Sequence, residues 1–245
     1  MLRRVLRHVV GHPGERELSP AAAYDLWSET YDRETDNVLT ILEGRVFARL
    51  LRTVEIRGRD LVDVGCGTGR HWSALLDRDP SSLVGYDVSL GMLDALRRKF
   101  SRATTYLSSA DSLAHTPERG CDVVISTLAL CHVARLEGAI AEWGRVLRPG
   151  GEVVVTDYHP AASAAGNCTF RHEGRLIAVK IYVHSMYALE SAAARNGLQL
   201  VAFDVATADE SIKPAYASSG MLPVFERIRG QPLIYGARMC KISRP

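Results

Sequence analysis

A glycine-rich segment beside an acidic residue is the part of this 245-residue sequence best suited to bind a ligand. Asp63 lies at the end of a short apolar run and is followed by glycines at positions 65, 67 and 69. Glycines let the backbone adopt positive φ and approach a ligand closely, and amides at the start of a following helix can bind an anionic group. A dinucleotide fingerprint has its third glycine at the sixth position, where this chain has Arg70. Although Gly67 alone could mark only a tight turn, the spacing and Asp63 together favour a ligand with an ammonium group and no phosphate.

Two further carboxylates follow the next apolar runs of the chain. Asp87 comes 22 residues after the first glycine, where a carboxylate can accept both hydroxyls of a ribose. Asp111, preceded by Ala110, follows the weaker run 104–107, where a carboxylate can accept from the exocyclic amine of adenine. Because ligands of open α/β sheets bind at the carboxyl ends of the strands, the three acids predict one nucleoside-binding edge. Asp111 could instead cap a helix, because Asp-Ser before an apolar residue is a helix-start signal.

The elements that must position these residues alternate between strand and helix patterns from about residue 41. This alternation predicts an α/β fold with a doubly wound, seven-stranded, mostly parallel sheet and helices on both faces. Pro214 and Pro223 interrupt any helix between the last two strands, so we expect these strands to form an antiparallel pair at the sheet edge. The expected strands are 59–64, 82–87, 104–107, 122–128, 152–157, 198–205 and 233–242, and the expected helices include 69–76, one capped by Ser89, one at 136–147 and one at 186–196.

Two segments lie outside the predicted sheet. Residues 1–36 are expected to form an N-terminal leader and a helical cap, with a basic leader over 1–17. Residues 159–185 are expected to form a lid inserted after the fifth strand, as a hairpin with Glu173-Gly174 at its turn. With these additions, the length of 245 residues predicts a single domain over 1–245.

Five stretches of the sequence, taken in order, resemble one known family. VDVGCGTG, GYDVS, SADSL, CDVVISTLALCHV and RVLRPGGEVVVTDYHP resemble the class I S-adenosylmethionine-dependent methyltransferases, over about residues 20 to 205. The segment YDLWSETYD is similar to the N-terminal cap of the small-molecule and quinone-type branch of that family. The resemblance implies a Rossmann-like methyltransferase fold and S-adenosyl-L-methionine as the cofactor.

The resemblance also implies roles for individual residues. Tyr24, Trp27 and Tyr31 would close the site from above, although the helical spacing of Tyr24 and Trp27 fits core packing equally well. The other implied cofactor contacts are Asp63, Gly65 and Gly67 at the methionine end, Asp87 on the ribose with Val88 beside the adenine, Ala110 and Asp111 at the adenine edge, and the backbone carbonyl of Ser126 or Thr127 at the amine.

Three histidines are candidates for a catalytic base. Methyl transfer is an in-line displacement that depends on positioning, and a base is needed only if the acceptor holds a proton, as a hydroxyl or phenol does. His159, two residues after Asp157, is the first choice; His132 follows the fourth strand, and His184 precedes a helix. Each of the three could equally be structural, and the family often has a histidine without a fixed catalytic role at the position of His132.

The charge and the fourth-strand segment indicate the class of acceptor. The net charge is only +2, from 30 basic and 28 acidic residues, and a nucleic-acid-binding protein usually has a larger basic excess. The segment 126–129 reads STLA and does not resemble the Pro-Pro-aromatic motif of nucleic-acid amino-methylating enzymes. We therefore expect a small-molecule acceptor. Oxygen is the favoured atom for methylation, with carbon or nitrogen as alternatives. A protein that binds the cofactor without transfer, and a protein or RNA methyltransferase, remain open.

Cysteines and apolar runs indicate the compartment. The five cysteines are odd in number and form no CxxC pair, which argues against a disulfide framework or a zinc site and predicts reduced thiols in the cytoplasm. No run approaches the ~20 apolar residues that span a bilayer, so no membrane partner is expected. His159, His172 and His184 have no carboxylate or cysteine at ligand spacing, so no metal is expected either. Nothing in the sequence indicates an oligomeric state.

Overall fold

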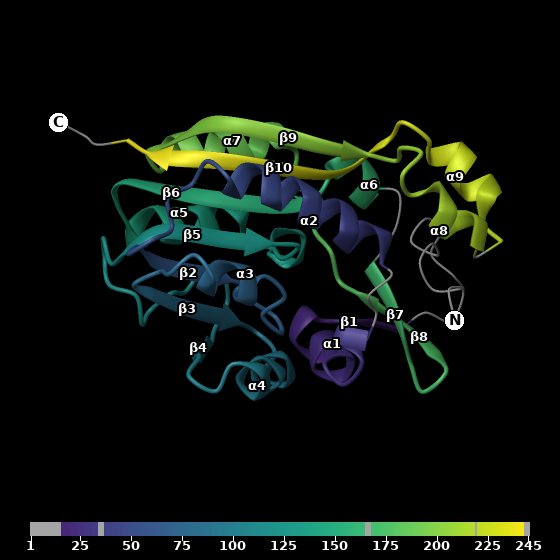
Figure 1. The fold of residues 1–245 in the computed structure, drawn as a ribbon, viewed down its shortest axis with the longest axis horizontal. Helices are drawn as coiled ribbons and strands as arrows, with labels where there is room; N and C mark the ends of the chain where they lie inside the picture. The colour runs from purple at the N-terminus through teal and green to yellow at the C-terminus, as the bar shows by residue number, and fades with distance from the viewer. Residues whose placement is uncertain (1–15, 34–36, 165–167, 219, 243–245) are drawn as a thin grey trace.

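The computed structural model of the protein describes residues 16–33, 37–164, 168–218 and 220–242, so most of the expected basic leader lies outside the described residues. Seven strands form one sheet in the order β4-β3-β2-β5-β6-β10-β9 (Figure 1). The first five pair in parallel, and β10 is antiparallel to both β6 and β9. This arrangement confirms the predicted doubly wound sheet with an antiparallel pair at its edge. The strands are β2 (Asp60–Val64), β3 (Ser82–Asp87), β4 (Thr104–Leu107), β5 (Cys121–Thr127), β6 (Leu147–Tyr158), β9 (Leu198–Thr207) and β10 (Pro232–Lys241).

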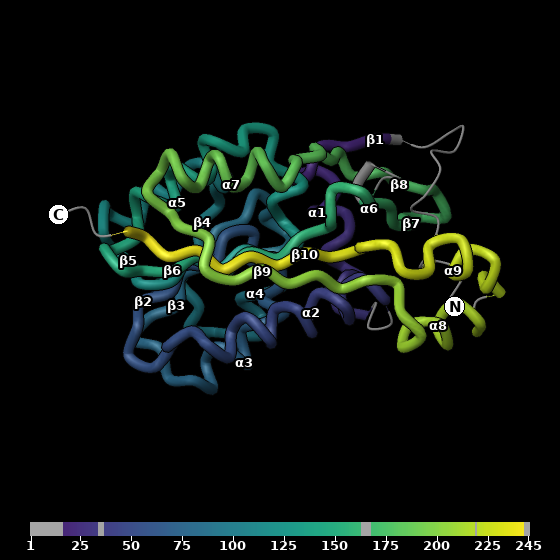
Figure 2. The backbone as a smooth tube through the Cα atoms, turned by 90° about the horizontal axis from the view of Figure 1, so that it is seen from above, coloured from purple at the N-terminus to yellow at the C-terminus, as the bar shows by residue number. Residues whose placement is uncertain are grey.

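Successive apolar residues of the central strands enter two separate cores. In β5, Val123 and Ile125 belong to one core and Val124 to the other, because alternate side chains of a strand point to opposite faces. The helices α2 (Val38–Leu51), α3 (Trp72–Leu76) and α4 (Leu90–Lys99) contribute to the first core, and α5 (Leu136–Val146) and α7 (Met186–Arg195) to the second. Figure 2 shows α5 and α7 on one side of the sheet and α2 and α3 on the other. Both faces are covered, as parallel sheets require.

Two local interpretations of the sequence are wrong. The helix expected over 69–76 begins only at Trp72, because Gly69 has a φ of +76° and the chain is still turning. The segment between β9 and β10 holds two short helices, α8 (Lys213–Ser218) and α9 (Leu222–Ile228). Pro214 and Pro223 each occupy the first turn of one of them, where a missing N–H breaks no helical hydrogen bond. These prolines start helices and do not interrupt one.

The predicted cap and lid meet in a second, smaller sheet. The hairpin of β7 (Cys168–His172) and β8 (Arg175–Val179) turns at Glu173-Gly174, as predicted, with positive φ at both residues. An unpredicted strand, β1 (Arg16–Leu18), pairs in parallel with β8, so its residues are not part of a leader. On its core side, α1 (Pro20–Trp27) places Trp27 in a parallel stack on Phe170, with 4.6 Å between ring centroids. We call β1, α1, β7 and β8 the roof; Figure 1 shows it beyond the arrowheads of β2, β3 and β5.

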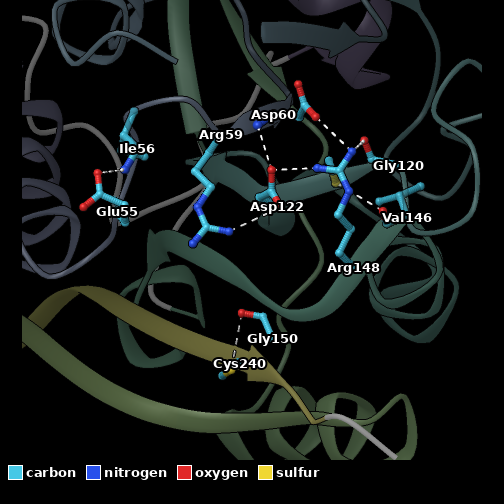
Figure 3. A network of polar contacts seen from close by, with 11 residues as sticks. Glu55, Ile56, Arg59, Asp60, Gly120, Asp122, Val146, Arg148, Gly150 and Cys240 are labelled. Carbon is cyan, nitrogen blue, oxygen red and sulfur yellow. Dashed lines mark hydrogen bonds and ion pairs between the residues drawn. The ribbon is translucent and has the colours of Figure 1, made fainter. Parts of the chain in front are cut away.

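Ionic contacts tie the sheet together at the opposite end of its strands (Figure 3). Asp122 Oδ2 accepts from the Asp60 backbone N–H at 2.9 Å and from Arg148 Nη1 at 2.7 Å. Arg148 Nη2 also lies 2.9 Å from Asp60 Oδ2 and donates to the Gly120 carbonyl at 3.1 Å. This network, which we call the amino-end network, joins the starts of β2, β5 and β6. The remaining elements are the short helices η2 (Tyr31–Arg33), η3 (Leu130–His132) and α6 (Pro160–Ala164).

Among the described residues, no helix is both long and apolar enough to cross a membrane. All five cysteines lie in the described residues, and none forms a disulfide. The described residues also contain no group of three or more His, Cys, Asp or Glu side chains arranged to hold a metal ion.

Candidate functional site

A cavity of about 360 Å³, the first cavity, lies between the carboxyl ends of the strands and the roof. Its walls come from the glycine loop, from the ends of β3, β4 and β5, and from α1. The structure thus gathers residues that are far apart in the sequence. The sequence-predicted residues among its lining are Tyr24, Tyr31, Gly65, Gly67, Asp87, Val88, Ala110, Asp111, Thr127 and His132.

The glycine loop needs glycine at two of these positions for different reasons. Gly65 has a φ of +73°, and a Cβ there would lie 2.3 Å from the Ala129 Cβ. Gly67 has a φ of +52°, and a Cβ there would meet no protein atom within 4 Å. Since Gly67 lines the cavity, that Cβ would occupy space left for a ligand. The glycine loop, which we call the cradle, therefore leaves a space that a side chain at Gly67 would fill.

Asp87 fixes this cradle to β3. Its Oδ2 accepts from the Gly67 N–H at 2.8 Å and its Oδ1 from the Ser89 N–H at 2.9 Å. Burial raises the pKa of Asp87 to about 6, against the opposite effect of these backbone donors. A carboxylate offers about four lone-pair sites, so Asp87 keeps acceptor capacity toward the cavity.

Asp63 is buried and lacks a full set of partners. It sits inside the sheet, paired in register with Gly85 and Ile125, and does not itself line the cavity. Its Oδ2 accepts from Trp72 Nε1 at 2.8 Å, and its Oδ1 is buried with no partner in the described part of the chain. Burial raises the pKa of Asp63 to about 7. A buried, incompletely paired carboxylate is stabilised by a nearby positive charge, so the site fits a ligand with an ammonium group.

The predicted adenine edge is held by neighbouring side chains. Asp111 Oδ1 accepts from Ser109 Oγ at 2.5 Å, and Oδ2 pairs with Arg135 at 2.5 Å. The Ser109 hydroxyl and then the Arg135 guanidinium hold the pKa of Asp111 below its usual range. The Ala110 carbonyl accepts from Trp143 Nε1 at 3.1 Å. No helix follows Asp111 in the described structure before residue 130, so the alternative that it caps a helix is wrong.

The end of β5 contributes Thr127 but not Ser126 to the lining. Ser126 is buried, and its Oγ has no hydrogen-bond partner among the described residues. Leu128 then adopts a left-handed φ of +53° while its N–H donates to the Thr156 carbonyl at 2.8 Å. After this turn, Leu128, Ala129 and His132 line the first cavity.

His132 and Tyr24 form a pair at the cavity wall. The Tyr24 hydroxyl lies 2.9 Å from His132 Nε2, and His132 Nδ1 lies 2.9 Å from the Lys180 carbonyl oxygen. Because a carbonyl only accepts, Nδ1 carries the proton and Nε2 accepts from Tyr24. Burial lowers the pKa of His132 and raises that of Tyr24. The imidazole is therefore neutral, with its basic nitrogen bonded to a phenol.

The other two predicted histidines lie elsewhere. His159 Nδ1 accepts from the Ala161 N–H at 3.3 Å at the start of α6, because the chain turns away from the sheet after β6 ends at Tyr158. His184 Nε2 donates to the Val133 carbonyl at 2.7 Å. Neither side chain lines the first cavity or the second one described next. The structure thus does not bring the first-choice base to the site.

A second cavity of about 310 Å³ adjoins the first and was not foreseen from the sequence. Tyr24, Tyr31 and Leu128 line both cavities. Trp27, predicted as a cofactor contact, lines only the second. The other lining residues of the second cavity are Asp32, Asn37, Thr40, Ile41, Arg70, Tyr158 and Cys168.

A buried glutamate pairs with Arg70, which lines the second cavity. Glu43 is fully buried; it pairs with Arg70 Nη1 at 2.6 Å, accepts from Thr156 Oγ1 at 2.6 Å and lies 3.2 Å from His71 Nε2. One signal in the sequence could have revealed it, since Glu43 stands on the apolar face of α2 beside Leu42 and Val46. An acid at such a position needs a buried partner.

Comparisons with known proteins agree with this site. Residues 62–155 match the family model described as a methyltransferase domain. The chain is 30% identical over 220 residues to an uncharacterized methyltransferase of Emericella nidulans, with 73% of this chain and 75% of that protein covered. It is 28% identical over 196 residues to the demethylmenaquinone methyltransferase of Tropheryma whipplei, with 77% and 74% covered.

The fold has a close match among solved structures. The S-adenosylmethionine-dependent methyltransferase of Mesorhizobium loti superposes with a TM-score of 0.60 at 22% identity, over 81% of this chain and 97% of that one. The relative that is 30% identical along almost three quarters of the chain and the match to the methyltransferase-domain model show that the protein belongs to the class I S-adenosylmethionine-dependent methyltransferases.

Proposed function

We propose that the protein transfers a methyl group to an oxygen atom of a small-molecule acceptor, with His132 as the base. The observation that carries this proposal is the neutral His132, whose Nε2 is bonded to Tyr24 at a wall shared by two cavities. The cavities, of about 360 and 310 Å³, have the size of small-molecule sites. The net charge of +2 supports a small acceptor over a nucleic acid.

The cofactor would occupy the first cavity. Asp87 would accept from the ribose hydroxyls with its remaining lone pairs, and Val88 and Ala110 would flank the adenine. Asp111 would accept from the adenine amine while Arg135 holds it in place. The charge of Asp63 behind the glycine loop, together with the Thr127 carbonyl at the cavity wall, would favour the ammonium group of the methionine end.

The protein's own residues would handle the proton. When bound, S-adenosylmethionine supplies an electrophilic methyl carbon on a sulfonium centre. An acceptor hydroxyl methylated in this way would lose its proton. Tyr24 is placed to take this proton while passing its own to His132 Nε2, and Lys180 fixes the required tautomer through Nδ1. The roof carries Tyr24 and would limit the access of water to this part of the first cavity.

Turnover of four variants tests the role of His132. S-adenosylhomocysteine release is measured with a panel of phenols and hydroxylated small molecules, for His132→Gln, Tyr24→Phe, His159→Gln and His184→Gln. We expect His132→Gln to lower kcat by about 100-fold or more, whereas His159→Gln and His184→Gln stay near the wild-type rate. Because the base must be neutral, wild-type kcat should fall as the pH drops through a value below 6.5. An unchanged rate in His132→Gln would exclude this mechanism.

The same assay separates the alternatives. A carbon or nitrogen acceptor with no proton to lose would be methylated without dependence on His132. A protein that only binds the cofactor would bind S-adenosylmethionine in calorimetry and release no S-adenosylhomocysteine with any acceptor.

A further inference from the structure

The second cavity contains hydrogen-bond donors that the protein does not use. Arg70 has five N–H donors, and contacts with described residues account for only part of them. Nη1 pairs with Glu43 at 2.6 Å and reaches the Thr40 carbonyl at 3.3 Å. Nε and Nη2 have no partner in the described part of the chain. The Arg70 side chain is 27% exposed and lines the second cavity.

Two phenols add further donors to the same cavity. The hydroxyls of Tyr31 and Tyr158 make no hydrogen bond with any described residue, and both side chains are only half-buried. Burial raises the pKa of Tyr31 to about 12 and that of Tyr158 well above its usual value. Both phenols therefore stay protonated near neutral pH and can donate.

The acceptor side chains that line this cavity each have partners within the protein, and the charge of Asp32 is balanced by Lys99. Asp32 accepts from Thr68 Oγ1 at 2.6 Å and from Lys99 Nζ at 2.8 Å. The Asn37 side-chain oxygen accepts from the Leu39 N–H at 3.0 Å at the start of α2. Glu43, behind Arg70, is held by Thr156 and His71 as well, so it does not need the remaining donors of Arg70. The two carboxylates at this cavity are thus each balanced by a cation, whereas Arg70, Tyr31 and Tyr158 keep unused donors, and such donors can bind an oxyanion.

We propose that the second cavity is the acceptor's carboxylate subsite, in which Arg70, Tyr31 and Tyr158 hold a carboxylate group of the substrate. This inference rests on the proposed function, because it takes the acceptor to be a small molecule bound across the two cavities. Trp27, Leu128 and Ile41 supply apolar walls beside these donors. The substrate class is therefore an acid with an aromatic or apolar body and a separate hydroxyl.

The shared wall explains how such an acid would be oriented. Tyr24, Tyr31 and Leu128 line both cavities, so a molecule held at Arg70 extends past them toward the first cavity. Its far end then meets the Tyr24–His132 pair. A carboxylate held at Arg70 would thus place the hydroxyl at the other end of the molecule beside Tyr24. Binding the substrate at two points lowers the entropic cost of orienting it for reaction. A monoanion suits the subsite better than a phosphate dianion, because Glu43 already shares the charge of Arg70.

Binding of acids and their amides tests the subsite. Calorimetry with protein saturated with S-adenosylhomocysteine compares 4-hydroxybenzoate, 4-hydroxyphenylacetate and 4-hydroxycinnamate with the primary amide of each, and with 4-hydroxyphenyl phosphate. We expect at least one acid to bind about tenfold or more tightly than its amide and more tightly than the phosphate. Equal binding of acids and amides, binding of the phosphate alone, or no binding by any acid would overturn the proposal.

Variants of Tyr158 and Arg70 test whether these residues provide the preference for the acid. Tyr158→Phe removes a hydroxyl that no described residue uses, so it should weaken the acid about threefold or more and leave the amide and S-adenosylhomocysteine unchanged. Tyr187→Phe makes the same change on a side chain that is 78% exposed, and should alter nothing. Arg70→Lys keeps a cation beside Glu43 but loses the planar fork, and it should reduce the preference for the acid. An undiminished preference for the acid over its amide in both Tyr158→Phe and Arg70→Lys would contradict the assignment of the subsite.

The outcome also separates this proposal from the proposed function. If an acid binds through Arg70 but receives no methyl group in a turnover assay, the subsite stands and oxygen methylation fails for that acid. If neutral phenols are methylated as fast as their acids, with the same dependence on His132, the proposed function stands and the subsite proposal fails.

Discussion

Asp63→Asn is expected to stabilise the ligand-free protein at alkaline pH. The folded-state pKa of Asp63 is about 7 against an ordinary value of 3.8. As the pH rises, the unfolded chain loses this proton first, so the folded state becomes progressively less stable between about pH 4 and pH 7 and stays so above it. The shift corresponds to about 4 kcal/mol. Asparagine resembles the protonated acid, can still accept from Trp72 Nε1, and does not ionise.

Urea unfolding at two pH values measures this difference. The advantage of the variant over the wild type in free energy of unfolding should be larger at pH 8 than at pH 5 by about 3 kcal/mol, because most of the wild-type loss falls between these two pH values. Asp87 and Asp157, whose pKa values burial also raises to about 6, are present in both proteins. The difference between the two proteins therefore reports Asp63 together with its coupling to Asp87, whose charge also raises the pKa of Asp63.

In cofactor affinity, by contrast, the wild type should exceed the Asp63→Asn variant. A ligand ammonium near Asp63 favours the ionised carboxylate, so the variant should bind S-adenosylmethionine more weakly than the wild type at pH 8. At pH 6, binding to the wild type should release a proton, which appears as a dependence of the calorimetric heat on the buffer's ionisation enthalpy. Equal stability of the two proteins at pH 8, or tighter cofactor binding by the variant, would refute the reasoning.

Two further predictions concern the cradle and the amino-end network. Gly67→Ala should cost about 1 kcal/mol of stability through its left-handed backbone and should weaken S-adenosylhomocysteine binding in calorimetry, because its methyl group enters the cavity. Gly150→Ala, with a φ of +76° and equally open surroundings, should show only the stability loss, and the same affinity in both variants would count against the cradle. Arg148→Ala should lower the urea-unfolding free energy by about 2 kcal/mol, because it leaves Asp122 without its main partner. Arg119→Ala, which breaks only an exposed contact to Glu118, is its control, and equal losses would show that the network adds nothing.

The sequence revealed the sheet because its signals are local. Each central strand carries a run of apolar residues long enough to be recognised, and the glycines and acids follow those runs directly. The position of Asp87 beside the Gly67 amide follows from the order of parallel strands. Those residues could be assigned to one edge without coordinates.

The remaining parts of the site depend on contacts between distant segments. The strand β1 has only three residues, too few for a period to be visible, and its partner β8 lies about 160 positions later in the chain. The orientation of His159 depended on where the chain turns after β6, which no pattern encodes. The choice of His132 needed the positions of Tyr24 and Lys180, which come from the cap and the lid.

The roof has a consequence for the order in which the molecule assembles. Its first strand is synthesised before every strand of the large sheet, but the strand that pairs with it is made only after five strands of that sheet. The two sheets share no strand, so the strands of the large sheet made by then can pair before β1 pairs with β8. Such a division lets one layer open as a cooperative unit at lower cost than the whole. Opening of the roof alone would expose the first cavity while the large sheet keeps its strand pairing.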